Sequence, residues 1–381
     1  MSQVPDSHMR KVSLREKVSF LMSIKEMGKA VTFDHIVEKV GRDSCALGEA
    51  EPAASQFKET LDSLVREGLL SQDAKGYYRR PSLDSYVAGF VSSARGSLNR
   101  SYFLVYLAER YYPAVVEDML PFLVGRPLSA VKVFSDKNDP IHEVEPIFVR
   151  YSKYRPTPVH LSVKGADDVM RLVHDHCVDF IPYVHGFDRR PDVFLVDLDL
   201  GESLASSIGS LAFAAKAASL VSEILSDAGC HPLAKFSGNR GFQVLCRMEA
   251  GGRALGFGDL RGAVKTVRVE LESRLQDVDP RKYDGLDIPR PYTTSSIDDK
   301  ESRSGKILVD WSSMKPEGDY RAPLSLHHKT GLASVPLTDG DLTSFAKDDA
   351  EPLSIASSGR DFSFAKGLPL TPWGALASLV A

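Results

Sequence analysis

The run VFLVDLDL, residues 193–200, is the feature that most constrains how this chain can fold. Its apolar residues, several of them β-branched or aromatic, predict a buried strand. Side chains alternate between the two faces of a strand, so Asp197 and Asp199 point the same way while Leu198 faces the core. Two neighbouring carboxylates repel each other, and one pKa should rise unless a cation lies between them. The end of this strand is therefore either solvated structure or a cation site.

A third acid favours the cation site. Asp310 in KILVDW also ends an apolar strand, and that strand can lie beside the first in one sheet. Carboxylate oxygens suit Mg²⁺ or Mn²⁺, and three of them at one sheet edge can hold one or two divalent ions, as in phosphoryl transfer. We therefore expect Asp197, Asp199 and Asp310 to be the metal ligands. Four further acids lie in loop-like sequence and are weaker candidates: Asp284, Asp287, Asp298 and Asp299.

The turn FSGNRGF, residues 236–242, supplies a second part of such a site. Small residues at Ser237, Gly238 and Gly241 let backbone amides approach a phosphate closely, and Arg240 can neutralise its charge. Taken alone, a glycine-containing turn between two strands is usually only a turn. A phosphate contact is the alternative interpretation.

The third part is RAPLSLHHKTG, residues 321–331, a segment bounded by proline and glycine. It concentrates Arg321, His327, His328 and Lys329 directly after the strand that ends at Asp310. Such donors suit a triphosphate, whereas the segment alone would be read as a solvated surface loop. Acids for metal, an amide-rich turn and a basic loop are together far more specific than any one of them.

The first 80 residues have a different pattern. Apolar positions at helical spacing predict helices within residues 13–28, 32–41 and 53–70, and YYRRP after a DAKG turn predicts a short hairpin. Three helices followed by a hairpin is the order of a winged-helix module. Lys75, Arg79 and Arg80 would lie at its wing, which favours nucleic acid or a protein as the partner over an accessory helical role.

Beyond residue 80 the pattern is mixed. A helical stretch precedes β-rich runs that carry Arg150, Lys153 and Arg155, and residues 193–247 read as strand, helix, and two strands joined by the FSGNRGF turn. This is a βαβ-like unit with an added antiparallel partner. We expect a catalytic domain over residues 81–345. Residues 346–381 lose periodicity and predict a flexible tail whose apolar end packs on the core or docks on a partner.

Composition excludes several classes of protein. The chain is 43% hydrophobic and 26% charged with a net charge of -4, so it is globular and has no polycationic character overall. Its cysteines, Cys45, Cys177, Cys230 and Cys246, show neither disulfide nor zinc spacing. Neither a secretory signal nor an apolar run long enough to span a bilayer is visible, so we expect a cytoplasmic protein without a membrane partner.

In order along the chain, VFLVDLDL, KFSGNRGF, ILVDW and RAPLSLHHKTG resemble the archaeo-eukaryotic primase superfamily. The last motif is most similar to the catalytic small subunit of DNA primase, which carries an R-x-P-x-S-x-H-x-K-T-G pattern. Upstream, LPFLVGRPLSAVKVF looks like the polymerase domain of bacterial end-joining ligases. The resemblance covers about residues 95–340. It implies an α+β fold with mixed and antiparallel sheets and an RRM-like βαβ unit, preceded by the winged-helix-like module.

The resemblance also implies roles for residues. Asp197, Asp199 and Asp310 would hold two divalent ions, Mg²⁺ or Mn²⁺, for template-directed nucleotidyl transfer. The incoming nucleoside triphosphate would be bound by residues of the turn and the basic loop: Ser237, Gly238, Arg240, Gln243, Arg321, His327 and Lys329. Lys235 and Arg247, which flank the turn, would touch nucleic acid or remain solvated.

The chain departs from the family pattern in two places. Gln243 stands where the family usually has a phosphate-contacting histidine, and glutamine can donate a hydrogen bond but carries no positive charge. The cysteine cluster that forms a zinc site in many primase small subunits is missing, which favours the end-joining or stand-alone branch of the superfamily.

Several functions therefore stay open. The primase-like signature favours synthesis of short primers on DNA, with a large primase subunit as a partner. Gap filling with end-joining repair proteins uses the same chemistry. A non-catalytic winged-helix DNA binder is disfavoured because the three acids are present. A sugar or nucleotide transferase with a D-x-D metal site would give no reason for RAPLSLHHKTG.

Overall fold

The computed structural model describes residues 13–22, 30–46, 50–67, 70–79, 100–134, 147–151, 160–249, 255–295 and 303–380. The chain divides into two compact units, Met1–Tyr106 with Val133–Val149, and Leu107–Lys132 with Arg150–Ala381. The domain boundaries predicted at residues 80 and 345 stay predictions. In the described part of the chain, no helix has the length and apolar character needed to cross a bilayer.

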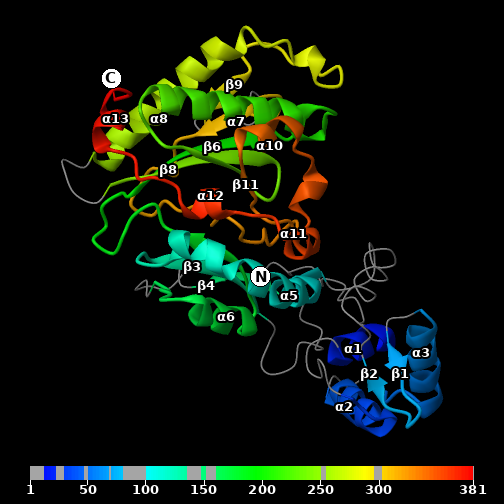
Figure 1. Ribbon diagram of the computed structural model, residues 1–381. Coiled ribbons are helices and arrows are strands. Elements are labelled where there is room, and N and C mark those ends of the chain that lie inside the picture. Colours follow the sequence, from blue (N-terminus) through cyan, green and yellow to red (C-terminus); the bar gives the residue numbers. More distant parts are fainter. Residues whose placement is uncertain are drawn as a thin grey trace, which may run out of the picture. The chain divides into compact units, whose positions relative to one another are not determined.

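A six-stranded sheet forms the frame of the second unit, with strand order β11-β7-β8-β6-β10-β9 (Figure 1). Its strands are β6 (Val193–Leu200), β7 (Leu233–Phe236), β8 (Gly241–Arg247), β9 (Thr293–Ser295), β10 (Ile307–Asp310) and β11 (Pro336–Leu337). Neighbouring strands are antiparallel except β9 and β10, which are parallel. The strand VFLVDLDL is β6 and lies inside the sheet, as its apolar character predicted.

The predicted βαβ-like unit is present. Helix α7 (Ser210–Asp227) connects β6 to β7, and β8 pairs antiparallel with both strands and lies between them. Helices α7 and α8 (Phe257–Leu275) pack against each other and against the sheet (Figure 1). Because side chains alternate along β6, the carboxylates of Asp197 and Asp199 lie on the face opposite the fully buried Val196 and Leu198.

A second sheet has the order β4-β3-β5, with β3 (Leu128–Phe134), β4 (Ile147–Tyr151) and β5 (Cys177–Pro182). Helices α5 (Arg100–Leu123) and α6 (Ala166–His174) accompany it. The Tyr112 hydroxyl of α5 donates to Val178 O at 2.8 Å and accepts the Leu326 N–H at 3.0 Å. Helix α5 is thereby fixed both to β5 and to the basic loop.

The first unit contains α1 (Leu14–Phe20), α2 (Phe33–Ala46), α3 (Ala54–Arg66), β1 (Ser71–Gln72) and β2 (Tyr78–Arg79). Its core packs Ile36, Phe57 and Leu61 at 0% exposure. The Asp73 carboxylate accepts the N–H groups of Lys75 and Tyr77 and closes the DAKG turn of the hairpin. The element order is the one expected, and the identification as a winged-helix module stays a prediction. Arg80, Lys153 and Arg155 lie outside the described residues.

The expectation of a flexible tail from residue 346 is wrong for the described residues. They form η4 (Lys347–Ala350), α11 (Pro352–Ser358), α12 (Ser363–Lys366) and α13 (Trp373–Ala377), after α10 (Asp339–Ser344). Leu376 is fully buried, and Trp373 Nε1 donates to Glu249 O at 3.0 Å. Each of these elements has seven residues or fewer, too few turns for a helical period to be visible in the sequence. The apolar end packs beside the end of β8.

Candidate active site

Strand pairing brings the three candidate acids to one face of the six-stranded sheet. Strand β10 lies next to β6, and its register sets Asp310 opposite Asp197 and Leu308 opposite Asp199. Residues directly opposite each other on neighbouring strands point to the same face, so Asp310 shares the face of Asp197 and Asp199. All three side chains are partly exposed. Residues more than a hundred positions apart in the chain are thus neighbours in the centre of the sheet.

As they are placed, the described side chains include no group of three His, Cys, Asp or Glu residues arranged to hold a metal ion. Hydrogen bonds from Ser312 hold the Asp310 side chain in its present place. The Asp310 carboxylate accepts the Ser312 N–H at 2.7 Å and the Ser312 hydroxyl at 2.8 Å. Both of its oxygens are therefore engaged by the turn that follows β10.

The electrostatics of the acids fit a divalent cation. Burial raises the pKa of Asp197 well above its usual range, and the charges of Asp199 and Asp310 raise it further. Burial also raises the pKa of Asp199, although the Arg240 guanidinium opposes that change. A cation among these oxygens would relieve the repulsion, and all-carboxylate oxygen ligands are what Mg²⁺ and Mn²⁺ prefer. Asp197, Asp199 and Asp310 are the residues that would hold such an ion.

The turn between β7 and β8 is pressed against both β6 and the basic loop. Gly238 has φ +87°, and a Cβ there would lie 2.9 Å from His327 Cβ. A Cβ at Gly241 would lie 2.0 Å from Leu198 O. Both positions therefore require glycine. Beside them, Ser237 Oγ is buried and has no hydrogen-bond partner within the described chain, while Arg240 is exposed. A buried unpaired hydroxyl of this kind is suited to a ligand.

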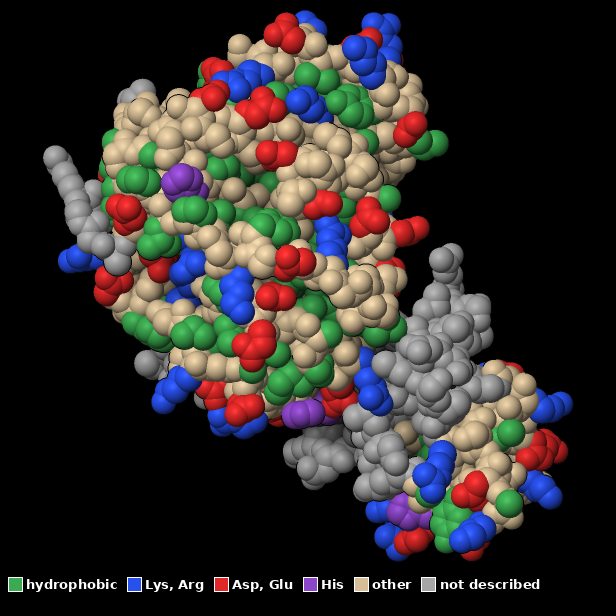
Figure 2. All heavy atoms as spheres, viewed as in Figure 1, with side chains coloured by type: hydrophobic (Ala, Val, Ile, Leu, Met, Phe, Trp, Pro, Cys, Tyr) green, Lys and Arg blue, Asp and Glu red, His purple; other side chains and the backbone are tan. Residues whose placement is uncertain are grey.

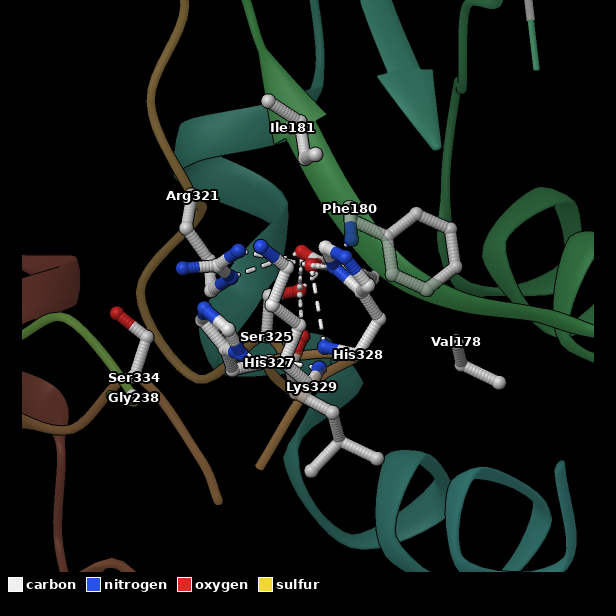
Figure 3. Close-up of polar contacts among 12 residues, drawn as sticks. Val178, Phe180, Ile181, Gly238, Arg321, Ser325, His327, His328, Lys329 and Ser334 are labelled. Atoms are coloured by element: carbon white, nitrogen blue, oxygen red, sulfur yellow. Dashed lines mark hydrogen bonds and ion pairs between the residues drawn. The ribbon is translucent and has the colours of Figure 1, made fainter. Parts of the chain in front are cut away.

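Arg321 connects the turn to the second sheet. Arg321, labelled in Figure 3, donates from its Nε and one terminal nitrogen to the two oxygens of Asp179 at 2.9 and 2.8 Å. The other terminal nitrogen donates to Ser237 O at 2.9 Å. Asp179 is completely buried. His328 Nδ1 lies 2.9 Å from the same carboxylate. Burial alone would raise the pKa of Asp179, but Arg321 and His328 hold it well below its usual range.

The backbone of the basic loop explains this placement. The N–H groups of Tyr320 and Ala322 donate to Pro182 O and Phe180 O, so this segment runs along the edge of β5. The Ser325 hydroxyl accepts the Phe180 N–H at 2.7 Å. Arg321 is therefore held beside Asp179 by main-chain contacts on both sides.

The two histidines of the loop differ in their surroundings. Their rings stack with centroids 5.3 Å apart. Burial and the charge of Arg321 lower the pKa of His327 to about 3, so it is neutral near pH 7. Its Nδ1 accepts the Lys329 N–H at 3.1 Å, so its proton lies on Nε2, which can donate. The Lys329 side chain is exposed.

Gln243 and Lys235 lie in the same row across the sheet as the acids. Gln243 is opposite Asp197 on β8, and Lys235 is opposite Gln243 on β7. Lys235 Nζ donates to Gln243 Oε1 at 2.6 Å and to Ser334 Oγ at 2.7 Å. Lys235 is fully buried, so both sequence-based alternatives for it, a nucleic-acid contact and a solvated surface side chain, are wrong. Arg247 is partly buried and lies over the Phe122 ring.

Sequence reasoning missed the buried Asp179 and the hydrogen bond between Lys235 and Ser334. The signal for Asp179 was a single charged residue in the apolar run CVDFIPYV, and for Lys235 a lysine within the strand LAKF. A charged residue is rarely fully buried unless it is paired. The weaker acidic candidates Asp284 and Asp287 are exposed, and Asp298 and Asp299 lie outside the described residues.

On the face drawn in Figure 2, acidic and basic side chains are interspersed. This agrees with the net charge of -4. A nucleic-acid contact is therefore better argued from the groups around the acids than from surface charge as a whole.

Comparison with known proteins gives a family match and a fold match for this chain. The family described as "LigD, primase-polymerase domain" matches residues 108–357. Among solved structures, the fold is similar to the polymerase domain of Mycobacterium tuberculosis ligase D in complex with DNA, with a TM-score of 0.50 and 18% sequence identity. The similarity covers 69% of this chain and 92% of that one. A search of curated proteins gives no match.

The matched residues contain β6, the turn, β10 and the basic loop, so the motifs that resembled the archaeo-eukaryotic primase superfamily all lie within the family region. The expected α+β core is confirmed by the same comparisons. The chain belongs to the LigD primase-polymerase domain family of the archaeo-eukaryotic primase superfamily, and is a polymerase of the nucleotidyltransferase class.

Proposed function

We propose that this protein is a DNA-templated polymerase that fills gaps during end-joining repair. The family itself, which is that of the ligase D polymerase domain, supports this role over primer synthesis. The related solved domain was obtained in complex with DNA, which supports DNA as the substrate here. The observation that carries the proposal is the register of β10 on β6, with Asp310 opposite Asp197.

In this proposal Asp197, Asp199 and Asp310 hold two divalent ions, Mg²⁺ or Mn²⁺. Bound there, the ions would activate the primer 3′-hydroxyl and neutralise charge on the departing pyrophosphate. The protein groups beside them would bind the triphosphate. Ser237 Oγ and the His327 Nε2–H would donate to phosphate oxygens, while Arg240 and Lys329, both exposed, would neutralise charge. Arg321, whose guanidinium already holds Asp179 and Ser237 O, would chiefly fix the turn.

The proposed repair role is tested by comparing two DNA substrates. With Mn²⁺ or Mg²⁺ and deoxynucleotides or ribonucleotides, we expect extension of the primer across a short gap in a duplex. We expect little or no product on an unprimed single strand. Product sizes on a denaturing gel give the measurement. Efficient synthesis on the unprimed strand would instead support the primase role, for which the R-x-P-x-S-x-H-x-K-T-G match remains the reason.

Replacing Ser237 separates ligand binding from stability. Because Ser237 Oγ makes no protein hydrogen bond in the described chain, Ser237→Ala should leave the thermal midpoint unchanged. Loss of a hydrogen bond to a charged phosphate, worth about 1.5–3 kcal/mol, should weaken nucleotide affinity roughly 10- to 100-fold. Nucleotide titration and thermal unfolding measure the two effects.

Ser334→Ala is the matched control. The Ser334 hydroxyl donates to Phe236 O and accepts from Lys235 Nζ, so its removal should lower the thermal midpoint. If Ser237→Ala is the less stable of the two variants and binds nucleotide normally, the assignment of Ser237 to phosphate binding is wrong.

A further inference from the structure

Lys235 is a fully buried lysine whose hydrogen-bond partners suggest a role in the candidate site. Its exposure is 0%, and the two hydrogen bonds from Nζ go to uncharged oxygens of Gln243 and Ser334. Burial and the charge of Arg321 lower its pKa to about 7, against the opposing effect of Asp197 and Asp179. A lysine in such a place costs stability, so it is expected where it serves the site.

The donor and the acceptor of each hydrogen bond around Lys235 are fixed. The Ser334 hydroxyl gives its proton to Phe236 O at 2.8 Å, so its oxygen can accept from Lys235. Gln243 Oε1 accepts from Lys235 at 2.6 Å, and the Gln243 Nε2 group is then left for donation. Gln243 is opposite Asp197 in the register of β8 and β6, so its amide N–H groups can donate to that carboxylate.

We propose that Lys235 is a positioning residue that acts through Gln243 to hold Asp197 in the orientation required for metal binding. This rests on the proposed function, in which Asp197 is a metal ligand. Lys235 Nζ is hydrogen-bonded to Ser334 Oγ and to Gln243 Oε1. Gln243 is opposite Asp197 in the register of β8 and β6, and Asp197 is opposite Asp310 in the register of β6 and β10.

The Lys235–Gln243 hydrogen bond accounts for the departure from the family pattern at residue 243. An amide can present either its oxygen or its nitrogen to Asp197, and only the nitrogen favours a carboxylate. Lys235 removes this ambiguity because it must donate to the amide oxygen. Protonated Lys235 places the positive charge that glutamine lacks one strand further away. Mutation of a partner that orients a metal ligand typically lowers metal affinity or activity about 10- to 100-fold.

The test measures Mn²⁺ affinity directly, without DNA or nucleotide, by calorimetry or electron paramagnetic resonance. Lys235→Met should weaken Mn²⁺ binding about 10- to 100-fold and lower kcat by a similar factor, with the KM for nucleotide unchanged. Removal of the buried charge should leave the thermal midpoint equal or higher. Lys216→Met, at a partly exposed position on α7 where Lys216 Nζ lies 3.7 Å from Glu223, is the matched control and should behave as wild type.

Gln243→Leu gives an independent variant that keeps Lys235 and removes the amide, and it should weaken Mn²⁺ binding as much as Lys235→Met. If Lys235 acts through Gln243, the double variant is no worse than the poorer single variant. Additive losses, or Mn²⁺ affinity unchanged in either single variant, overturn the proposal.

The reference variant Asp197→Asn distinguishes this inference from the proposed function. If wild type binds no Mn²⁺ and incorporates no nucleotide, the proposed function fails. If wild type does both and Asp197→Asn does neither, while Lys235→Met and Gln243→Leu match wild type, only the positioning role fails.

Discussion

Asp197→Asn should reduce nucleotide incorporation at least about 10³-fold, because it removes a metal ligand. A bound metal ion stabilises the transition state by several kcal/mol, and each 1.36 kcal/mol of that stabilisation is a factor of ten in rate. Asp197 is at the centre of the candidate site, with Asp310 opposite on β10 and Gln243 opposite on β8. Single-turnover extension of a gapped duplex with Mn²⁺ measures the effect. Asp188→Asn, at an exposed position in the turn before β6, is the control and should keep full activity.

The same variant should be more stable than wild type when divalent ions are removed. The folded-state pKa of Asp197 is raised, to about 8, above an unfolded value of about 3.9. Stability contributed by the protonated acid is therefore complete below the unfolded pKa and is lost as the pH rises through the folded one. Asparagine has no charge to lose, so its advantage over wild type should be larger at about pH 9 than at about pH 5.

Thermal unfolding in EDTA at the two pH values measures this difference. A variant that is less stable than wild type at the higher pH would show that Asp197 is not subject to repulsion from its neighbours. Undiminished nucleotide incorporation would remove Asp197 from the catalytic site, whatever its stability.

The sequence predicted those parts of the fold whose signal is local. VFLVDLDL became β6, the predicted helix after it became α7, and the FSGNRGF turn joins β7 to β8. The strand is a short apolar run with β-branched and aromatic residues, the helix is a long apolar-rich run, and glycine marks the turn. Residues 346–381 were misread because the helices there are too short to show a period, although Leu376 and Trp373 are buried.

The site was predictable as a set of motifs but not as a set of contacts. The acids, the turn and the basic loop each have a recognisable composition. The Asp179–Arg321 pair joins residues 142 positions apart, and the Lys235–Ser334 hydrogen bond joins residues 99 apart. Such pairs depend on strand register and on the path of the loop along β5, which a single sequence does not specify. Gln243 was recognised as unusual, but its partner Lys235 became visible only when β7 and β8 were paired.

Asp179→Asn should destabilise the protein by about 3–5 kcal/mol, because it leaves the Arg321 guanidinium largely buried without its counter-charge. Asp179 is completely buried and accepts two hydrogen bonds from Arg321. Its folded-state pKa is lowered, so its contribution is present above the unfolded pKa and is lost as the pH falls through the folded one. The difference between variant and wild type should therefore shrink in acid. Urea unfolding near pH 7 and at about pH 2.5, below the unfolded pKa of about 3.9, measures it.

Asp175→Asn provides the matched control, since Asp175 is exposed in its ion pair with Lys132 and should contribute less than about 1 kcal/mol. The double variant Asp179→Asn with Arg321→Met removes both charges and should recover much of the lost stability. It should not recover nucleotide affinity, because Arg321 would no longer hold Ser237 O and the turn that carries the phosphate-binding hydroxyl. Recovery of both would mean that the ion pair stabilises the fold without organising the site, and recovery of neither would mean that Asp179 acts through His328 rather than Arg321.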